Sequence, residues 1–537
     1  MRPIVWSIAG NDSAGGAGLA ADQRAADACE VHLCPVVSAI TAQNSTGVER
    51  IELMPADLLD AQLQALATDM PPRAIKTGLL GSAEQVRLVA QWVDKLRVGS
   101  SVPIALVVDP VLRASSGANF ADAQTIAAYR EYLLPRATLI TPNRHEARIL
   151  LGSAAASNAA TGSPSTLSIP ELARTLRAHG AQAVCITGGD STEPSDHLKN
   201  LSLDWLDSTH AQGWLAIERV ATGHSHGTGC TFATSAAAAL ARGFVAADAV
   251  LLAKMATTHA LRRAYAAGQG SGPVHASAGF TSDPSLLPMM SWGEAAQFPA
   301  LQHSALPYQH DLGLYAIVDS AHRVDAVLAA GVRTVQLRTK TPEQPSAAWH
   351  KALRTSMVHS IAACSSAGAR LFINDHWILA LELGAQGLHL GQEDLLVLTD
   401  AQRSELCHSG VALGISSHSL WELARARSLS PAYIACGPVW PTLTKTMPWQ
   451  AQGTDNLAWW CAMAGTPVVA IGGILSAGQI MQVAQCGAGG VCAVRVLGEN
   501  PVLTVPALQQ ALTAGRKLSP TDATLAWPHP SLAGPFT

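Results

Sequence analysis

Two glycine-rich segments in the first half of the chain have the composition of phosphate-binding turns. Residues 10–18 (GNDSAGGAG) follow a short apolar run, and residues 222–231 (TGHSHGTGCT) precede a run of small residues. Glycines let the backbone approach a ligand closely, and the free N–H groups at a helix N-terminus attract anions. Gly227 and Gly229 would therefore help to form a cradle of donors for the charge that develops on a transferred phosphoryl group. The structural alternatives are a tight strand–helix connection and a packing turn.

Cys230 directly follows the second turn and is the candidate catalytic group of the first half. We expect it in the first turn of a helix, where the pKa of a thiol tends to fall. The alternative is a buried structural cysteine beside the turn.

Cations, amides and carboxylates follow several apolar runs in the second half of the chain. Gln336, Arg338 and Lys340 alternate at the end of one run, so an extended backbone would present them on one side, where they suit a diphosphate. Asp375 and Asp394 follow two other runs and could share one Mg²⁺ ion that bridges a diphosphate. The structural alternatives are a strand that ends in surface charge and, for the two aspartates, helix N-caps.

Two later segments add hydroxyl groups, a cation and glycines. Thr442, Thr444 and Lys445 lie in one proline-bounded loop, and Gly472 and Gly473 follow a late apolar run. If the second half is a barrel of alternating strands and helices, loops at these positions often hold a phosphate.

The polar residues of the second half stand at the ends of eight short apolar runs, each followed by room for a helix. The runs are 314–318, 334–337, 371–373, 387–390, 412–415, 433–435, 468–471 and 491–494. Eight such units in about 200 residues predict a small (β/α)₈ TIM barrel, with the active site at the carboxyl ends of its strands.

The first half alternates β-branched runs with helical periodicity, which is typical of α/β folds with parallel sheets. Its expected strands include 4–9, 74–77, 105–109, 139–141 and 183–187. Prolines without periodicity predict a linker, and a tail with four prolines is predicted to be poorly ordered. The predicted divisions are 1–275, a linker over 276–310, 311–515, and a tail over 516–537.

The composition excludes several classes of protein. A net charge of −4 argues against a nucleic-acid partner, and the ten cysteines form no CxxC pair or zinc-ligand spacing. The longest apolar stretch, 235–260, is broken by three charged residues, so no membrane segment or membrane partner is expected. We therefore predict a cytoplasmic protein with small-molecule substrates, and homo-oligomers remain open.

The order of motifs in the first half is similar to that of the hydroxymethylpyrimidine kinase/phosphomethylpyrimidine kinase family of thiamine biosynthesis. The motifs are 10–18, TAQNSTG at 41–47, DPV at 109–111, TPN at 141–143 with Glu146, GTGC at 227–230, and GQGSGPV at 268–274. The resemblance covers about residues 1–275. It implies a ribokinase-like three-layer α/β/α fold that uses ATP and Mg²⁺ to phosphorylate 4-amino-5-hydroxymethyl-2-methylpyrimidine, and then its monophosphate.

The resemblance assigns roles to individual residues of the first half. Asp22 and Gln43 match pyrimidine-binding positions, and Gln offers the donor and acceptor that an aminopyrimidine edge needs. Asn143 and Glu146 match positions near the nucleotide and Mg²⁺. A solvated helix face, a polar loop group and helix capping are the respective structural alternatives.

Departures from the kinase family concern the nucleotide contacts and the base. Ser115 and Thr187 stand where lysine is common, which leaves a pyridoxal-type vitamin kinase as the alternative. Cys230 stands where related sugar kinases carry an aspartate base. We interpret it as a group that can stay neutral when the second acceptor, itself a phosphate, approaches.

The second half resembles thiamine-phosphate synthase over about residues 311–512. That family joins hydroxymethylpyrimidine diphosphate to 4-methyl-5-(2-phosphoethyl)thiazole and releases diphosphate. The resemblance assigns the pyrimidine diphosphate to Gln336, Arg338, Lys340, Asn374, Ser416 and Lys445, and Mg²⁺ to Asp375 and Asp394. It assigns the thiazole phosphate to Thr442, Thr444, Gly472, Gly473, Val494 and Arg495. Thr339 replaces a usual aspartate, and Arg495 replaces a usual serine.

The product of the first half would be the substrate of the second. The sequence therefore predicts a bifunctional enzyme that makes thiamine monophosphate. The alternative from another class is a chain in which one half only binds a ligand and regulates.

Overall fold

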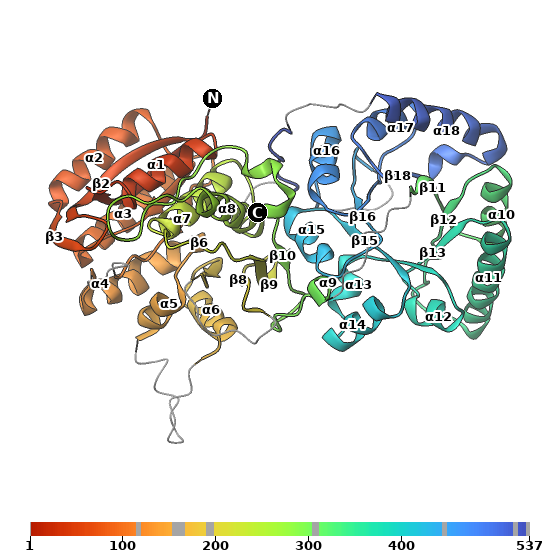
Figure 1. The fold of residues 1–537 in the computed structure, drawn as a ribbon, viewed down its shortest axis with the longest axis horizontal. Coiled ribbons are helices and arrows are strands. Elements are labelled where there is room, and N and C mark those ends of the chain that lie inside the picture. Colours follow the sequence, from red (N-terminus) through yellow and green to blue (C-terminus); the bar gives the residue numbers. More distant parts are fainter. Residues whose placement is uncertain are drawn as a thin grey trace, which may run out of the picture. The chain divides into compact units, whose positions relative to one another are not determined.

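The computed structural model describes residues 2–113, 120–152, 167–189, 198–302, 311–442, 448–518 and 525–532 (Figure 1). The chain divides into two compact units, the first of residues 1–296 with 534–537 and the second of residues 297–533. Ser115, Thr444 and Lys445 lie outside the described residues.

The first unit is built on one sheet of ten strands in the order β10-β9-β8-β7-β6-β5-β4-β1-β2-β3. The parallel strands are β1 (Ile4–Asp12), β2 (His32–Gln43), β4 (Ala74–Thr77), β5 (Ala105–Val108), β6 (Leu139–Ile140) and β7 (Val184–Ile186). The antiparallel strands are β3 (Val48–Leu53), β8 (Leu201–Asp207), β9 (Gln212–Glu218) and β10 (Met289–Met290). The strand order reverses at β1, and open α/β sheets bind ligands beyond the carboxyl ends of strands at such a point.

Helices cover both faces of this sheet, which confirms the predicted α/β/α layers (Figure 1). The first layer comprises α1 (Gly18–Ala28), α7 (Thr228–Ala241) and α8 (Ala246–Arg262). The other comprises α2 (Ala56–Asp69), α3 (Ala83–Gly99), α4 (Ala123–Ala128), α5 (Arg144–Leu151) and α6 (Ile169–Ala178). Helix α7 packs on β1, β4 and β5, and its alanine-rich body is buried. Small side chains allow this close approach, which brings the helix N-terminus to the carboxyl ends of the strands.

The predicted linker is wrong over its first part. Residues 276–296 belong to the first unit, where β10 extends the sheet beside β9. Phe280, Leu286 and Met290 are buried. The short turns at 280–286 contact α8, and only Met289 and Met290 of this segment join the sheet.

The second unit is a closed barrel of eight parallel strands, as the eight apolar runs predict. The strands are β11 (Gly313–Val318), β12 (Thr334–Leu337), β13 (Arg370–Asn374), β14 (Gly387–Leu390), β15 (Ala412–Ser417), β16 (Tyr433–Cys436), β17 (Val468–Ala470) and β18 (Gly490–Ala493). Strand β18 pairs with β11 and closes the ring. The barrel interior contains Tyr315, Phe372 and Tyr433, and a Cβ atom on Gly414 would lie 2.2 Å from the Tyr433 ring. A glycine in β15 therefore makes room for the aromatic ring.

Helices surround this barrel (Figure 1). After the short α9 (Pro299–Gln302), they are α10 (Ala321–Ala329), α11 (Ala347–Ser366), α12 (Trp377–Glu382), α13 (Gln392–Leu396), α14 (Asp400–His408), α15 (Leu420–Arg427), α16 (Gly453–Met463), α17 (Ala477–Gln485) and α18 (Pro501–Lys517). Nowhere in the described parts of the chain is a helix long and apolar enough to span a bilayer.

The prediction of a poorly ordered tail is wrong for residues 525–532. The backbone N–H of His529 donates to Asn456 Oδ1 at 2.8 Å, and the Gln450 N–H donates to the Ser531 carbonyl at 2.8 Å. Leu532 also forms an isolated bridge with Trp449. Backbone partners therefore fix this proline-containing segment against the barrel.

Candidate active sites

The glycine loop between β1 and α1 is closed by its own aspartate. The Asp12 carboxylate accepts the N–H groups of Ala14, Gly16 and Ala17 at 2.9, 3.0 and 2.8 Å. These donors are therefore not available to a phosphate, and the tight strand–helix connection is the better interpretation of residues 10–18.

The turn before α7 keeps the character of an anion site. Gly227 is its N-cap at φ +86°, and a Cβ atom there would lie 2.2 Å from the Gly16 carbonyl oxygen. Thr228, Gly229 and Cys230 form the first turn of the helix, whose N–H groups have no partner within a helix. The turn therefore requires glycine at 227 and directs backbone donors toward the end of the sheet.

Asp22 is bonded within the protein, and its contact with the pyrimidine stays a prediction. The side chain is fully buried, and its carboxylate accepts hydrogen bonds from Ser7 Oγ at 2.6 Å and Thr234 Oγ1 at 2.7 Å. Both carboxylate oxygens lie 3.0 Å from Lys76 Nζ. These contacts use the oxygens of Asp22 and tie α1, β1, β4 and α7 together.

Lys76 is a functional candidate that sequence reasoning missed. It is fully buried in β4, and its Nζ lies 3.9 Å from Asp109 Oδ2 as well as 3.0 Å from Asp22. Burial alone would lower its pKa, but the charges of Asp22 and Asp109 hold that pKa above its ordinary value. A lysine within the apolar run 74–77 is the signal that could have revealed it, because a buried lysine needs a partner.

The negative charge of Asp109, at the end of β5, is only partly neutralised by its neighbours. Burial raises the pKa of its carboxyl to about 6, against the opposing charge of Lys76. Its Oδ2 accepts no hydrogen bond from the residues that the structure describes. A buried carboxylate oxygen with unused capacity can receive a metal ion or a hydrogen-bond donor from a ligand.

The expectation of a lowered pKa for Cys230 is wrong. Burial raises the pKa of this thiol to about 12, although Lys76 and the Gly18 N–H lower it. The helix terminus acts only locally, and the loss of solvation outweighs it. The thiol is therefore neutral in the free protein.

Three motifs that are distant in sequence meet beside Gln43. Gly270 N–H donates to Ser45 Oγ at 3.1 Å, and His226 N–H donates to the Gly272 carbonyl at 3.1 Å. Gln43 lies at the end of β2, with its amide 3.2 Å from the His226 ring. Strand β2, the α7 turn and the segment 268–274 therefore form one wall around this glutamine.

Asn143 and Glu146 form a capping box at the start of α5. Asn143 Oδ1 accepts the Glu146 N–H at 2.9 Å, and Glu146 Oε2 accepts the Asn143 N–H at 3.0 Å. The Thr187 N–H donates to the Pro142 carbonyl at 3.0 Å, so the β7 end is adjacent. Capping is therefore shown, and contact with a nucleotide stays a prediction.

In the barrel, Asp375 and Asp394 interact at the carboxyl ends of β13 and β14. Burial and the Asp394 charge raise the pKa of Asp375, which Arg338 lowers. Asp375 has φ +65°, a conformation that costs energy outside glycine and is common at functional sites. Asp394 also caps α13, because its Oδ2 accepts the Gly391 N–H at 2.8 Å.

This pair suits Mg²⁺ that is shared with a substrate. Among the described residues, no group of three or more His, Cys, Asp and Glu side chains could enclose a metal ion. Mg²⁺ usually keeps several waters and takes one or two carboxylates together with substrate phosphates. Two neighbouring carboxylates whose charges repel one another are the donor set that such an ion needs.

A chain of polar side chains runs through the barrel interior and connects two of the predicted ligand contacts. Gln336 Nε2 donates to Tyr315 Oη at 3.2 Å, and Tyr315 Oη lies 2.7 Å from Tyr433 Oη. His389 Nδ1 lies 2.7 Å from Tyr433 Oη, and its Nε2 lies 2.8 Å from Ser416 Oγ. Burial, with a contribution from Arg338, lowers the pKa of His389 to about 3, so the chain is uncharged.

Sequence reasoning predicted the two ends of this chain, Gln336 and Ser416, and missed the three residues between them. Tyr315 and Tyr433 look like ordinary aromatic members of apolar runs. His389 within the run 387–390 was the available signal, because a histidine in a buried strand must have partners.

The remaining predicted residues lie around the same end of the barrel. Asn374 is buried at the end of β13, Arg338 is half-buried, and Lys340 is exposed. Gly472 and Gly473 have φ +91° and +73°, and Cβ atoms there would lie 2.7 and 2.6 Å from Pro438 and Trp440.

The loop after β18 completes this end of the barrel. Val494 is 43% exposed, and Arg495 is exposed and begins a short 3₁₀ turn (Arg495–Leu497). Thr442 ends the described part of the β16 loop.

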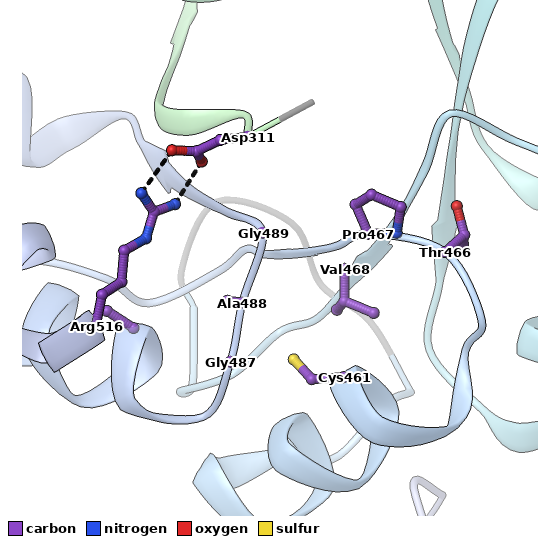
Figure 2. Close-up of a pocket in the computed structure, with 10 residues that line it drawn as sticks. Asp311, Cys461, Thr466, Pro467, Val468, Gly487, Ala488, Gly489 and Arg516 are labelled. Atoms are coloured by element: carbon purple, nitrogen blue, oxygen red, sulfur yellow. Dashed lines mark hydrogen bonds and ion pairs between the residues drawn. The ribbon is translucent and has the colours of Figure 1, made fainter. Parts of the chain in front are cut away.

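A cavity of about 440 Å³ lies at the opposite, amino end of the strands (Figure 2). Its wall includes Pro467 and Val468 at the start of β17, with Cys461 from α16. Asp311 and Arg516 form a two-bonded ion pair at its edge, at 2.7 and 2.5 Å (Figure 2). The predicted ligand residues are absent from its wall, so this cavity is separate from the candidate site.

Comparisons with known proteins assign each half of the chain to an enzyme family. Residues 12–275 match the phosphomethylpyrimidine kinase family, and residues 314–497 match the thiamine monophosphate synthase family. A probable thiamine biosynthetic bifunctional enzyme of Oryza sativa subsp. japonica is 32% identical over 93% of this chain and 86% of its own length. That of Arabidopsis thaliana is 33% identical over 94% of this chain and 91% of its own length. The chain belongs to the thiamine biosynthetic bifunctional enzymes.

The first unit is thus the kinase half of this family, and the barrel is the synthase half. A solved structure of the pyridoxal kinase from Staphylococcus aureus with ADP is 27% identical and covers 51% of this chain and 93% of its own, with a TM-score of 0.43.

The buried ion pair of the kinase half gives a testable expectation. Lys76→Met leaves the Asp22 carboxylate buried without its cation, and breaking such a pair costs about 3–5 kcal/mol. We expect denaturant unfolding to show that loss, and the double variant Asp22→Asn/Lys76→Met to recover most of it. A Lys76→Met variant as stable as the parent would show that the Lys76–Asp22 ion pair does not stabilise the fold.

Proposed function

We propose that the chain makes thiamine monophosphate in three steps at two sites. The kinase half phosphorylates the hydroxyl of 4-amino-5-hydroxymethyl-2-methylpyrimidine with ATP and then phosphorylates the monophosphate. The synthase half joins the resulting diphosphate to 4-methyl-5-(2-phosphoethyl)thiazole and releases diphosphate. The observation that carries this proposal is that one chain contains both halves of a bifunctional family, and the product of one is the substrate of the other.

In the kinase half, the α7 turn binds the phosphoryl group during its transfer. The first-turn N–H groups of Gly229 and Cys230 stabilise the charge that develops on it. The neutral thiol of Cys230 lets a phosphate-bearing second acceptor approach without the repulsion that a fixed carboxylate would cause. Gln43 binds the aminopyrimidine edge through one donor and one acceptor.

Mg²⁺ in the kinase half would be held by the unused oxygen of Asp109, with Asn143 and Glu146 shaping the adjacent nucleotide loop. When bound, the ion neutralises phosphate charge. Lys76 lies 3.9 Å from Asp109 Oδ2 and partly neutralises that carboxylate.

In the synthase half, the leaving diphosphate is the centre of the mechanism. Arg338, Lys340 and Lys445 supply cations for the charge that develops on it, and Asp375 and Asp394 would hold the Mg²⁺ that shares its oxygens. The electron-rich aminopyrimidine supports a carbocation-like methylene centre, which the thiazole nitrogen attacks. No protein nucleophile is needed.

The interior polar chain recognises the pyrimidine, and the late loops recognise the thiazole. Gln336, Asn374 and Ser416 contact the pyrimidine diphosphate from an uncharged interior, which avoids competition with the cations at the rim. The thiazole phosphate is bound by residues of the late loops, namely Thr442, Thr444, Gly472, Gly473, Val494 and Arg495.

A cytoplasmic location and a homo-oligomeric assembly stay predictions from the sequence. The names of the Oryza sativa and Arabidopsis thaliana relatives describe those proteins as chloroplastic.

A one-pot reaction followed by mass spectrometry tests the proposal. The chain receives the hydroxymethylpyrimidine, ATP, Mg²⁺ and the thiazole phosphate, and we expect thiamine monophosphate. Accumulation of pyrimidine diphosphate would contradict the synthase assignment. In a parallel assay with pyridoxal, phosphorylation of pyridoxal but not of the pyrimidine would contradict the kinase assignment. Substrate binding without turnover would mean that the half concerned only regulates.

Asp375→Asn tests the metal site of the barrel. Asparagine tolerates positive φ, so the fold is retained, but one Mg²⁺ oxygen ligand loses its charge. We expect synthase kcat to fall by about 100-fold, which is the typical cost of removing one group that stabilises charge in the transition state. The Mg²⁺ concentration needed for half-maximal activity should rise. The exposed Asp325→Asn, on α10, is the matched control and should retain activity. Unchanged Mg²⁺ dependence in Asp375→Asn would remove this residue from the site.

A further inference from the structure

The amide of Gln43 lies between two side chains that restrict its orientation. Its Nε2 position is 3.2 Å from His226 Nε2, and its Oε1 position is 3.5 Å from Thr41 Oγ1. The two orientations of an amide exchange oxygen and nitrogen between the same two positions, so the neighbouring hydrogen bonds decide which atom is where.

His226 must carry a proton on Nε2. That nitrogen lies 3.0 Å from Asp12 Oδ2, which already accepts the N–H groups of Gly16 and Ala17. Although burial would raise the pKa of Asp12, the hydrogen bonds from His226, Ala17 and Ala14 hold it below its ordinary value, so the carboxylate only accepts. An ionised carboxylate at this distance requires a donor on the imidazole.

The protonated nitrogen then determines the orientation of Gln43. A ring N–H cannot accept from the amide NH₂, but it can donate to the amide oxygen as well as to Asp12. The amide oxygen therefore occupies the position beside His226, and the NH₂ group occupies the position beside Thr41.

Thr41 leads to the same orientation independently. Its Oγ1 lies 3.1 Å from the Asn11 carbonyl oxygen, which can only accept, so the single hydroxyl proton goes there. Thr41 Oγ1 then has only lone pairs left for Gln43, and the group beside it must be the NH₂ donor.

We propose that Asp12, His226 and Thr41 lock the Gln43 amide in one orientation and thereby make the kinase half select an aminopyrimidine over the corresponding oxopyrimidine. The lock leaves one lone pair on the amide oxygen and one N–H for a ligand. An aminopyrimidine presents an NH₂ donor beside a ring-nitrogen acceptor, which matches this pair. An oxopyrimidine presents the reverse pattern, which an amide that is free to rotate would also accept. The inference rests on the proposed contact between Gln43 and the pyrimidine.

His226→Phe tests the lock. The ring is retained where it packs against Gly16, but the N–H is lost. The measurement compares kcat/KM for two substrates. One is the hydroxymethylpyrimidine, and the other is its analogue in which an oxo group replaces the amino group on the ring. The ratio is the first kcat/KM divided by the second. We expect the ratio in favour of the amino substrate to fall by about tenfold or more, mainly through KM, because unpaired polar groups dominate such discrimination.

Two further variants separate a positioning role from a structural one. Thr41→Val removes the other partner of the amide and should lower the same ratio. His224→Phe is the matched control: His224 Nδ1 accepts the Gly272 N–H at 3.1 Å from the same turn, and the ratio should not change. Equal losses on both substrates in His226→Phe and Thr41→Val, with an unchanged ratio, would overturn the lock. A parent enzyme that phosphorylates neither pyrimidine would instead contradict the proposed function.

Discussion

Charge buried at the carboxyl ends of parallel strands is the constraint on which the kinase half depends. A lysine that loses its solvation must be paired, and Lys76 is fully buried in β4. Its partner, Asp22, comes from α1 and also accepts a hydrogen bond from Thr234 on α7. Neutralising the charge of Lys76 therefore holds α1 and α7 against the sheet. It also fixes the glycine loop and the turn that precede these helices. The anion cradle lies where it does because the charge beneath it must be neutralised.

The synthase half contains an uncharged interior and keeps the charged residues of its candidate site at the end of the barrel. Its interior contains an uncharged chain of tyrosines and a histidine whose pKa is lowered to about 3. Its charges, Arg338, Asp375 and Asp394, lie at the mouth of the barrel, where they influence one another. This separation suits the two reactions. Phosphoryl transfer needs charge close to a buried acceptor, whereas departure of a diphosphate needs charge at the place where the diphosphate leaves.

The features that could be predicted from sequence were local. Each barrel strand is a continuous apolar run followed by a polar residue. Both the strand and the polar residue at its carboxyl end could therefore be predicted from the sequence. Asp22 could not be interpreted in this way, because an aspartate on a helix has the same local pattern whether it faces solvent or a lysine 54 residues away. The pKa of the Cys230 thiol was misjudged for a related reason: the helix turn can be predicted locally, but the burial that raises the pKa is a property of the folded chain. Prolines concealed the buried side chains of 280–290, because their partners, helix α8 and strand β9, are distant in the sequence.

The kinase half holds the buried Asp109 carboxylate with its negative charge only partly neutralised. Its pKa is raised from 3.8 to about 6, so the folded state holds this proton more tightly than the unfolded state. Ionisation of Asp109 therefore costs stability as the pH rises through that window. The direct measurement is the free energy of unfolding against pH, for the parent and for Asp109→Asn. The account predicts that the parent loses stability relative to the variant between pH 4 and pH 6, and a difference that stays constant or moves in the opposite direction would contradict it.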